Sequence, residues 1–236
     1  MTENASAAAA ADGRRHAAAR DVRVVLLTMT TGAVDAVTFL LLGKVFSSVI
    51  TGNLVVLGVS AATGSASEAL HAGVALAAYA AGVAVGAPLA ARGGDHDATW
   101  PRSVTVTLAA ELCVLAAFCA GWELASGRPR DGGLLVLLVL AASAMGMQSA
   151  ATRRLGQMSS TYLTSTLTAV VAALATGKRP QAMGRSLGAI AAIVAGAVAG
   201  GLLAEKAYAW LPVMVLLPLG LVVAGRLTGL DETLRP

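Results

Sequence analysis

Charged residues are scarce in this chain, and their scarcity excludes most soluble folds. Only 13% of the 236 residues are charged, while 56% are hydrophobic. A typical soluble domain has roughly 25% charged residues. The sequence therefore predicts an all-α integral membrane protein, built from apolar helices that contact the lipid bilayer.

Cysteine, histidine and aromatic residues are also few. Cys113 and Cys119 are six positions apart in one apolar run and would point in different directions on a helix, which argues against a disulfide or a metal site. The three histidines lie in the N-terminal arm or near the ends of apolar runs, and no metal-ligand cluster, phosphate loop or nucleophile motif is present. Basic residues form no stripe with interleaved aromatics. We therefore expect no enzyme, catalytic residue, cofactor, metal or nucleic-acid partner.

Six apolar runs are long enough to cross the ~30 Å hydrocarbon core, which needs about 20 helical residues. The predicted spans are Val22–Gly43, Ala69–Ala91, Ser103–Trp122, Gly133–Thr152, Arg185–Ala204 and Tyr208–Ala224. Two shorter apolar pieces, Ser47–Ala62 and Ser159–Thr176, are richer in Ser, Thr, Gly and Asn. They either cross as thin helices or enter the membrane and return, and we favour six full spans.

The basic residues predict the orientation of these spans. If both short pieces return, the Lys and Arg residues outside the cytoplasm are Lys44, Arg128, Arg130 and Lys206. The remaining Lys and Arg residues, out of 17 in the chain, lie on the other side of the membrane. Because basic residues concentrate in the cytoplasm, that side is the cytoplasmic one. Both termini are therefore expected there, and the eight-span alternative gives the same orientation. The predicted parts are a disordered arm, the transmembrane domain and a short tail, at residues 1–21, 22–226 and 227–236.

The chain repeats itself over two halves, about residues 22–125 and 133–226. A shift of 113 residues superimposes several positions, namely Leu42 on Leu155, Gly43 on Gly156, Ser47 on Ser160, Thr51 on Thr164 and Leu54 on Leu167. Each half would hold three spans and one short piece, so the second half would insert upside down. Inverted repeats with short, Gly-interrupted segments are typical of transporters. A duplication retained only as scaffold is the simpler alternative.

Small residues at intervals of four form a ladder in each half. A shift of 114 superimposes Ala78, Gly82, Gly86 and Ala90 on Ala192, Gly196, Gly200 and Ala204, and Gly188 extends the second ladder. Such ladders let helix backbones approach closely. We expect them to pack helices within one protomer, with a homodimer face as the alternative.

Two groups of motifs carry a resemblance to a known family. The first comprises Asp35-Ala36-Val37-Thr38-Phe39-Leu40-Leu41-Leu42-Gly43, then Phe46, Thr51-Gly52-Asn53-Leu54 and Leu57-Gly58. The second comprises Gln148, Ala150, Thr161-Tyr162-Leu163-Thr164 and Thr166-Leu167. Together they resemble the YoaK-like family of small bacterial membrane proteins, although Ser149 stands where we expect Asn and Ser165 where we expect Gly. The resemblance implies about six helices in a bacterial inner membrane, and it names no substrate.

Asp35 is the first candidate for a functional site. It lies near the middle of the first span, where an ionisable group costs roughly 2.5–3.5 kcal/mol on insertion scales unless it faces protein or water. Thr28, Thr31 and Thr38 share its helix face at intervals of three and four, so that face should point into the bundle. Asp35 either binds a proton or cation, or ties helices together through hydrogen bonds.

Other polar residues extend this candidate site. Within the short pieces, Gly52 lets the backbone turn between Thr51 and Asn53, while Thr164 and Thr166 occupy the related positions. In the spans, the candidates are Glu111 and Gln148, the latter corresponding to Asp35 under the 113 shift. The sequence therefore predicts a small-solute or ion-coupled permease with a polar centre. The alternative is a noncatalytic scaffold or accessory subunit.

Overall fold

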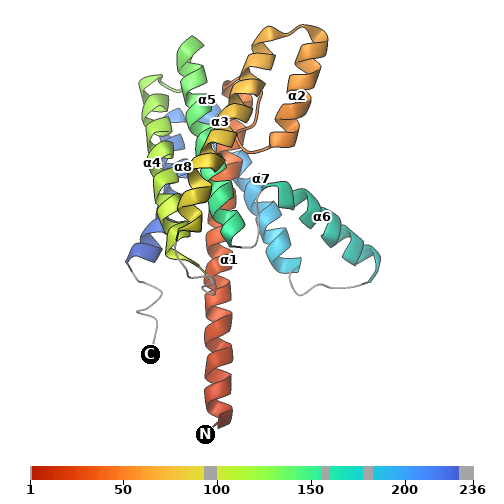
Figure 1. Ribbon diagram of the computed structural model, residues 1–236, viewed down its shortest axis with the longest axis vertical. Coiled ribbons are helices and arrows are strands. Elements are labelled where there is room, and N and C mark those ends of the chain that lie inside the picture. The colour runs from red at the N-terminus through yellow and green to blue at the C-terminus, as the bar shows by residue number, and fades with distance from the viewer. Residues whose placement is uncertain (1, 93–99, 156–159, 178–182, 229–236) are drawn as a thin grey trace.

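The computed structural model describes residues 2–92, 100–155, 160–177 and 183–228, and within these ranges it is an all-α bundle (Figure 1). The described helices are α1 (Thr2–Leu41), α2 (Ile50–Thr63), α3 (Ala66–Ala91), α4 (Arg102–Leu124), α5 (Asp131–Arg154), α6 (Ser160–Ala175), α7 (Met183–Lys206) and α8 (Leu211–Leu227). Six segments are long and apolar enough to cross a membrane: Ala18–Leu41, Ala66–Ala91, Arg102–Leu124, Asp131–Arg154, Met183–Lys206 and Tyr208–Leu227. They overlap the six predicted spans, which confirms the predicted fold class.

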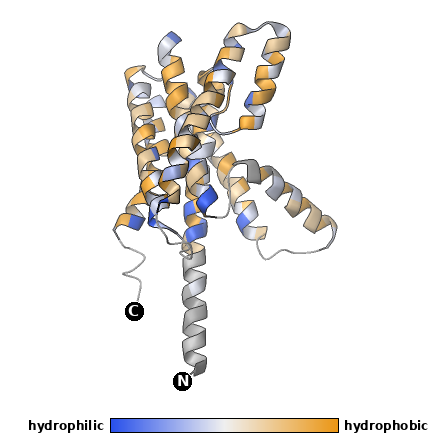
Figure 2. Cartoon of the chain, in the orientation of Figure 1, coloured by the Kyte–Doolittle hydropathy of each residue, from blue (hydrophilic) through white to orange (hydrophobic). Residues whose placement is uncertain are grey.

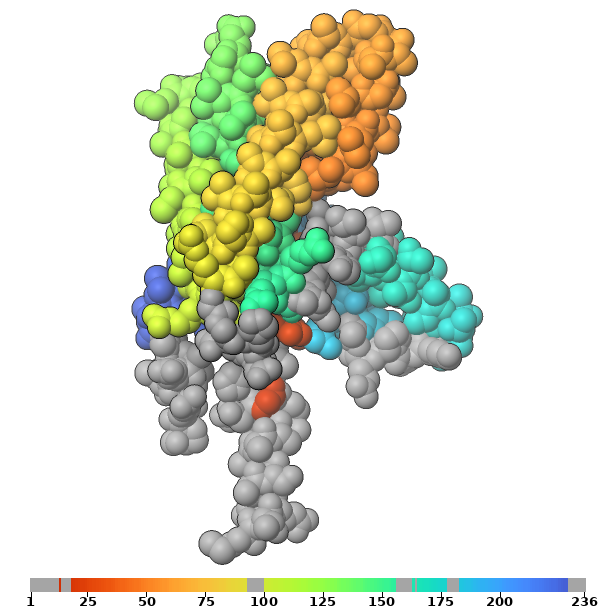
Figure 3. Space-filling model, in the orientation of Figure 1, coloured from red at the N-terminus to blue at the C-terminus, as the bar shows by residue number. Residues whose placement is uncertain are grey.

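The other two described helices, α2 and α6, are too short to cross a bilayer. They have 14 and 16 residues, or about 21 and 24 Å at 1.5 Å per residue, against a core of ~30 Å. Among the described contacts, α2 packs chiefly on α3 and α6 chiefly on α7. In Figure 1 the turn between α2 and α3 lies at the upper end of the bundle, whereas α6 slopes downward and outward from α7. Figure 3 shows α6 standing out from the side of the molecule. The two half-helices therefore approach the bundle from opposite ends.

The most extensive helix contacts join the two halves. α1 packs most on α7, and α3 packs most on α5. α6 and α8 also contact the first pair, α2 and α4 contact the second, and α8 and α4 contact each other across the two sets. We call these sets the α1–α7 group and the α3–α5 group. The first helix of each predicted half thus belongs to the group formed mainly by the other half, so the halves interlock.

Glycines make both close helix pairs possible. A Cβ added at Gly196 of α7 would collide with the Met29 carbonyl oxygen of α1. A Cβ added at Gly82 of α3 would collide in the same way with the Ser143 carbonyl oxygen of α5. Because small residues let backbones meet at this distance, helix packing within the protomer explains the ladders.

The remaining ladder glycines are not equally confined. An added Cβ would lie 2.9 Å from the facing backbone at Gly86 and 2.6 Å from it at Gly200. At Gly188 the nearest atom would be a valine methyl group at 4.0 Å, an ordinary van der Waals contact. In the second ladder, close packing therefore involves Gly196 and Gly200 and leaves Gly188 outside the tight crossing.

The N-terminal arm differs from its prediction. Residues 1–21 are rich in alanine and were expected to be disordered, but α1 begins at Thr2 and continues without a break to Leu41. Alanine has the highest helix propensity of all residues, and the first span offers a preformed helix end on which further turns can add. The predicted tail at 227–236 lies outside the described residues beyond Thr228.

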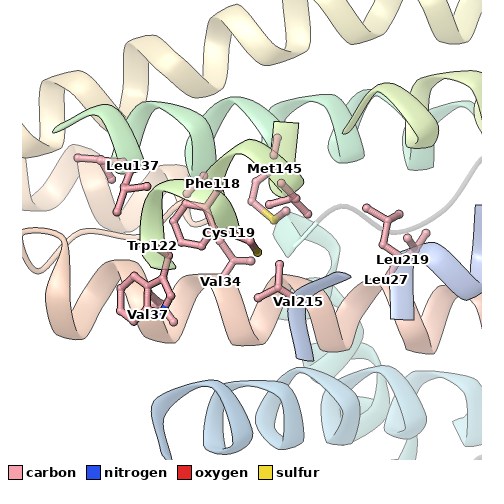
Figure 4. Packing of buried hydrophobic residues seen from close by; sticks show 14 of the residues in the cluster. Leu27, Val34, Val37, Phe118, Cys119, Trp122, Leu137, Met145, Val215 and Leu219 are labelled. Carbon is pink, nitrogen blue, oxygen red and sulfur yellow. The ribbon is translucent and has the colours of Figure 1, made fainter. Parts of the chain in front are cut away.

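The interior is apolar, and its largest side chains lie between α4 and its neighbours. Figure 4 shows Phe118 and Trp122 of α4 near Val34 and Val37 of α1, with Leu137 of α5 close by. The rings of Phe118 and Trp122 stack with their centroids 6.3 Å apart. In Figure 2 the outward faces of the long helices are largely orange, the colour of apolar residues, as expected for helices surrounded by lipid.

Candidate functional site

Asp35 fastens the loop that joins α1 to α2. Its carboxylate belongs to a residue that is 6% exposed, and it accepts three hydrogen bonds. The Ser47 hydroxyl donates to Oδ1 at 2.6 Å, the Ser48 backbone N–H donates to Oδ1 at 2.8 Å, and the Ser48 hydroxyl donates to Oδ2 at 2.5 Å. An ionised carboxylate only accepts hydrogen bonds, and such charge-assisted bonds are stronger than neutral ones. Asp35 therefore holds the loop against α1.

Three of the four residues on the predicted face of α1 are buried, and Thr28 is half-buried. Thr31 is 8% exposed, Asp35 is 6% exposed and Thr38 is fully buried. The Thr38 hydroxyl donates to the Asp35 backbone carbonyl at 3.1 Å. The spacing of three and four residues thus identified a face that points into the bundle.

Asn53 closes the same loop from α2. Its Oδ1 accepts the Phe46 backbone N–H at 2.9 Å, and its Nδ2 donates to the Phe46 carbonyl at 2.6 Å. Irregular backbone within a membrane needs such partners because no lipid can provide them. Asn53 is fully buried, whereas Thr51 is exposed on α2. Thr51 and Asn53 therefore lie in different environments, and both polar groups of the Asn53 amide are used by the loop.

Gln148 connects α5 to α1. Its Nε2 donates to the Leu27 carbonyl at 3.1 Å and to the Thr31 hydroxyl at 3.0 Å. Its Oε1 is buried and accepts no hydrogen bond from the residues that the structure describes. A buried acceptor without a donor costs about 1–3 kcal/mol. Gln148 Oε1 is therefore a place where a water molecule or a bound ligand would be stabilised.

A cavity of about 30 Å³, which we call the polar cavity, lies beside these groups. It has room for one or two water molecules. Its polar wall is made of Thr28, Thr31, Ser48, Gln148, Ser149 and Thr152. Its apolar wall is made of Val24, Leu27, Met145, Leu163 and Ile193. The wall thus receives residues from α1, the Asp35-bound loop, α5, α6 and α7.

The residue of the second half that is equivalent to Asp35 differs from the one predicted. In the two glycine crossings Gly82 corresponds to Gly196 and Ser143 to Met29, and both correspondences are shifts of 114 residues. The counterpart of Asp35 on α5 is therefore Ser149 rather than Gln148, and Ser149 also lines the polar cavity. The 113 shift holds for the loops, so one residue has been gained or lost between the helix and the loop.

Glu111 lies apart from this cluster. It is fully buried on α4, and neither of its carboxylate oxygens has a hydrogen-bond partner among the described residues. It does not line the polar cavity. The structure therefore does not bring Glu111 together with the other predicted polar residues.

The second short piece contributes little of what was predicted. The Thr164 side chain lies outside the described part of the structure, and Thr166 is half-buried on α6. Thr166 does not line the polar cavity, to which α6 contributes Leu163. Thr152, which sequence reasoning missed, follows Gln148 by four residues. That interval places both residues on one helix face and could have identified it.

Comparison with known proteins places these features in a family. The family model described as "Protein of unknown function (DUF1275)" matches residues 24–225. The chain is 32% identical over 157 residues to the UPF0700 transmembrane protein YoaK of Bacillus subtilis (strain 168), which is 66% of this chain and 67% of that protein. No solved structure matches the chain. The resemblance to YoaK-like proteins read from the motifs is confirmed, and this multi-pass membrane protein belongs to the DUF1275 family.

Proposed function

We propose that this protein is a transporter-like permease for a small solute or an ion, located in the bacterial inner membrane with both termini in the cytoplasm. The observation that carries the proposal is the polar cavity, which lies where the α1–α2 loop meets α1, α5 and α6. In many secondary transporters, discontinuous helices at the interface of inverted repeats hold the substrate and ion sites. Two half-helices that approach from opposite ends of a bundle fit that arrangement.

The position of the cavity between helix groups supports the proposal. α1 and α5 both line it, yet these two helices contact each other far less than each contacts its main partner. Polar groups inside a membrane are costly and usually mark a solute or ion pathway. A polar cavity between two helices that contact each other so little can widen without breaking either glycine crossing.

A noncatalytic scaffold or accessory subunit is the second candidate, and two residues favour it. Asp35 and Asn53 have their polar groups occupied by the α1–α2 loop, an arrangement that needs no solute. Under this candidate the cavity holds water and only satisfies buried polar groups. Neither candidate involves a chemical reaction, a cofactor or a nucleic acid.

Access to the cavity from both sides of the membrane distinguishes the two candidates without knowledge of the solute. In a protein with Cys113 and Cys119 replaced by alanine, Ser149→Cys places a thiol in the cavity wall. We expect silver ion, a membrane-impermeant and thiol-reactive cation small enough for the cavity, to label it in both right-side-out and inverted vesicles. Thr107→Cys is the matched control, because Thr107 is fully buried on α4 and does not line the cavity.

Two results would contradict the permease. The first is a folded Ser149→Cys protein that stays unlabelled from both sides, as Thr107→Cys should. The second is labelling from one side only under every condition tested, because a permease must expose its site to both. A labelled protein would then be reconstituted in proteoliposomes and assayed for uptake across a panel of small solutes, with and without a pH gradient.

A further inference from the structure

Three threonine hydroxyl groups that line the polar cavity have their protons committed elsewhere. Thr28, Thr31 and Thr152 each donate to the backbone carbonyl four residues earlier, at 2.8, 3.1 and 2.9 Å. A carbonyl can only accept, so the hydroxyl must be the donor in each bond. Each threonine therefore offers only oxygen lone pairs to other partners.

The Gln148 amide and the Ser48 hydroxyl also have their protons committed to other groups of the protein. Both described hydrogen bonds of the Gln148 Nε2 go to α1, while Gln148 Oε1 remains buried without a donor. The Ser48 hydroxyl donates its proton to Asp35. The groups that line this cavity are thus mainly acceptors, with few protons left for a ligand that needs donors.

The charged groups around the cavity also favour a cation over an anion. The residues lining the cavity include no lysine, arginine or histidine. The nearest carboxylate in this network belongs to Asp35, which lies behind Ser48 and is bonded to its backbone and side chain. An anion would find few donors and no positive charge, whereas a cation would find oxygen ligands and the negative charge of Asp35 directly behind Ser48.

The oxygen atoms that line the cavity and the cavity volume indicate which class of cation could bind. Divalent ions such as Ca²⁺ and Mg²⁺ take carboxylate ligands directly, and no carboxylate lines this wall. Neutral hydroxyl and carbonyl oxygens with one carboxylate in the second layer match a single positive charge. The volume of about 30 Å³ admits one small ion that has lost most of its water.

We propose that the polar cavity is a binding site for a small monovalent cation. Gln148 Oε1 and the hydroxyl oxygens of Thr28, Thr31 and Thr152 are its ligands, and Asp35 provides the balancing charge. This inference rests on the proposed function for its choice of site, and it names the class of ion that a permease of this kind would couple or carry. Binding itself can be measured without transport.

Thermal unfolding of the purified protein in detergent tests the inference. The full chain is dialysed into choline chloride, whose cation is too large for the cavity, and titrated with lithium, sodium, potassium or ammonium chloride at constant ionic strength. A ligand that binds only the folded state raises its stability with ligand concentration. We expect at least one of these ions to raise the midpoint by several degrees, with a half-maximal concentration that defines an apparent affinity.

Matched threonine variants assign the effect to the cavity. Thr28→Val and Thr152→Val each remove one acceptor oxygen at constant shape, and each should weaken the apparent affinity at least tenfold. Thr30→Val is the control, because Thr30 is fully buried on α1 and bonds a carbonyl four residues earlier but does not line the cavity. Gln148→Glu adds a negative charge at the unpaired oxygen and should strengthen the ion dependence, even if the ion-free protein is less stable.

Several outcomes would overturn the inference. Equal midpoints in choline and in all four small cations mean that the cavity holds only water. A loss of ion dependence in Thr30→Val as large as that in Thr28→Val means that the ion binds elsewhere. The proposed function fails separately: ion-dependent stability without two-sided labelling of Ser149→Cys leaves a cation site in a protein that is not a permease. Two-sided labelling without any cation effect rejects only the cation site.

Discussion

Replacing Asp35 with leucine should destabilise the protein far more than replacing it with asparagine. Leucine leaves the hydroxyl groups of Ser47 and Ser48 and the Ser48 backbone N–H without their acceptor. A buried donor that loses its partner costs about 1–3 kcal/mol. The hydroxyl groups can turn toward other acceptors but the N–H cannot, so we expect a total loss of about 2–4 kcal/mol.

Asparagine preserves most of this arrangement. Its Oδ1 can still accept from Ser47 and from the Ser48 N–H, and its Nδ2 can donate to the Ser48 hydroxyl oxygen once that hydroxyl turns. The amide also removes the cost of placing a charge in the membrane, which is roughly 2.5–3.5 kcal/mol on insertion scales. We therefore expect Asp35→Asn to lie within about 1 kcal/mol of the parent.

Thermal unfolding in detergent measures the difference. A change of 1 kcal/mol shifts the midpoint of a chain of 150–250 residues by about 2–4 °C, so Asp35→Leu should unfold roughly 5–15 °C lower and Asp35→Asn within about 4 °C of the parent. An Asp35→Leu protein as stable as the parent would refute the role of this carboxylate in holding the loop. At matched folded amounts, Asp35→Asn should also lose most of the ion-dependent stabilisation, because the balancing charge is gone.

Three further predictions address the packing, the isolated acid and the orientation. Gly196→Ala should lower the free energy of unfolding by about 1–3 kcal/mol, as overpacking does, because the new Cβ meets the Met29 carbonyl. Gly188→Ala should have little effect, because its Cβ has room. Equal unfolding midpoints for the two variants would contradict the tight crossing. Glu111→Gln should leave stability unchanged or raise it, because the acid has no described partner to lose, and a fall of several degrees in thermal unfolding would indicate that its charge is needed. Reporters active only in the periplasm should give no signal when fused to either terminus, and a strong signal at either end would reverse the predicted orientation.

The six spans could be predicted because their signal is local. A run of about 20 apolar residues specifies a membrane helix without reference to the rest of the chain. The small-residue ladders were equally readable, since an interval of four places residues on one face of a helix whatever it packs against. The sequence also identified Asp35 and Gln148 as buried polar residues, because any polar group in such a run must face protein.

The partners of these residues could not be predicted in the same way. Asp35 meets Ser47 and Ser48 through a loop whose course depends on the Asn53 bonds to Phe46. Gln148 meets α1 from a position 121 residues beyond Leu27, a contact that exists only because the two halves interlock. The shift of 113 fits the loops but is one residue too small for the long helices. The sequence therefore predicted Gln148 as the equivalent of Asp35, whereas the helix crossings give Ser149.

The interlocked packing also predicts where the molecule should move. Both glycine crossings lie within groups, α1 with α7 and α3 with α5, and backbones that fit so closely do not slide easily. The polar cavity is lined from both groups, and the loop held by Asp35 joins a helix of one group to a helix of the other. Motion between the groups would therefore change the cavity and the Asp35 bonds together.

Spin-label distances test this expectation. Val85 on α3 and Val198 on α7 are more than half exposed and belong to different groups, while Val136 on α5 belongs to the group of Val85. In a protein without native cysteines, labels at Val85 and Val198 should give a broad or two-component distance distribution that narrows when the favoured cation is added, because an ion bound from both groups stabilises one arrangement. Labels at Val85 and Val136 should give one narrow distribution in every salt. If the pair between groups is as narrow and as insensitive to salt as the pair within one group, the cavity lies in a rigid bundle, and neither a moving boundary nor a permease mechanism that depends on it can be maintained.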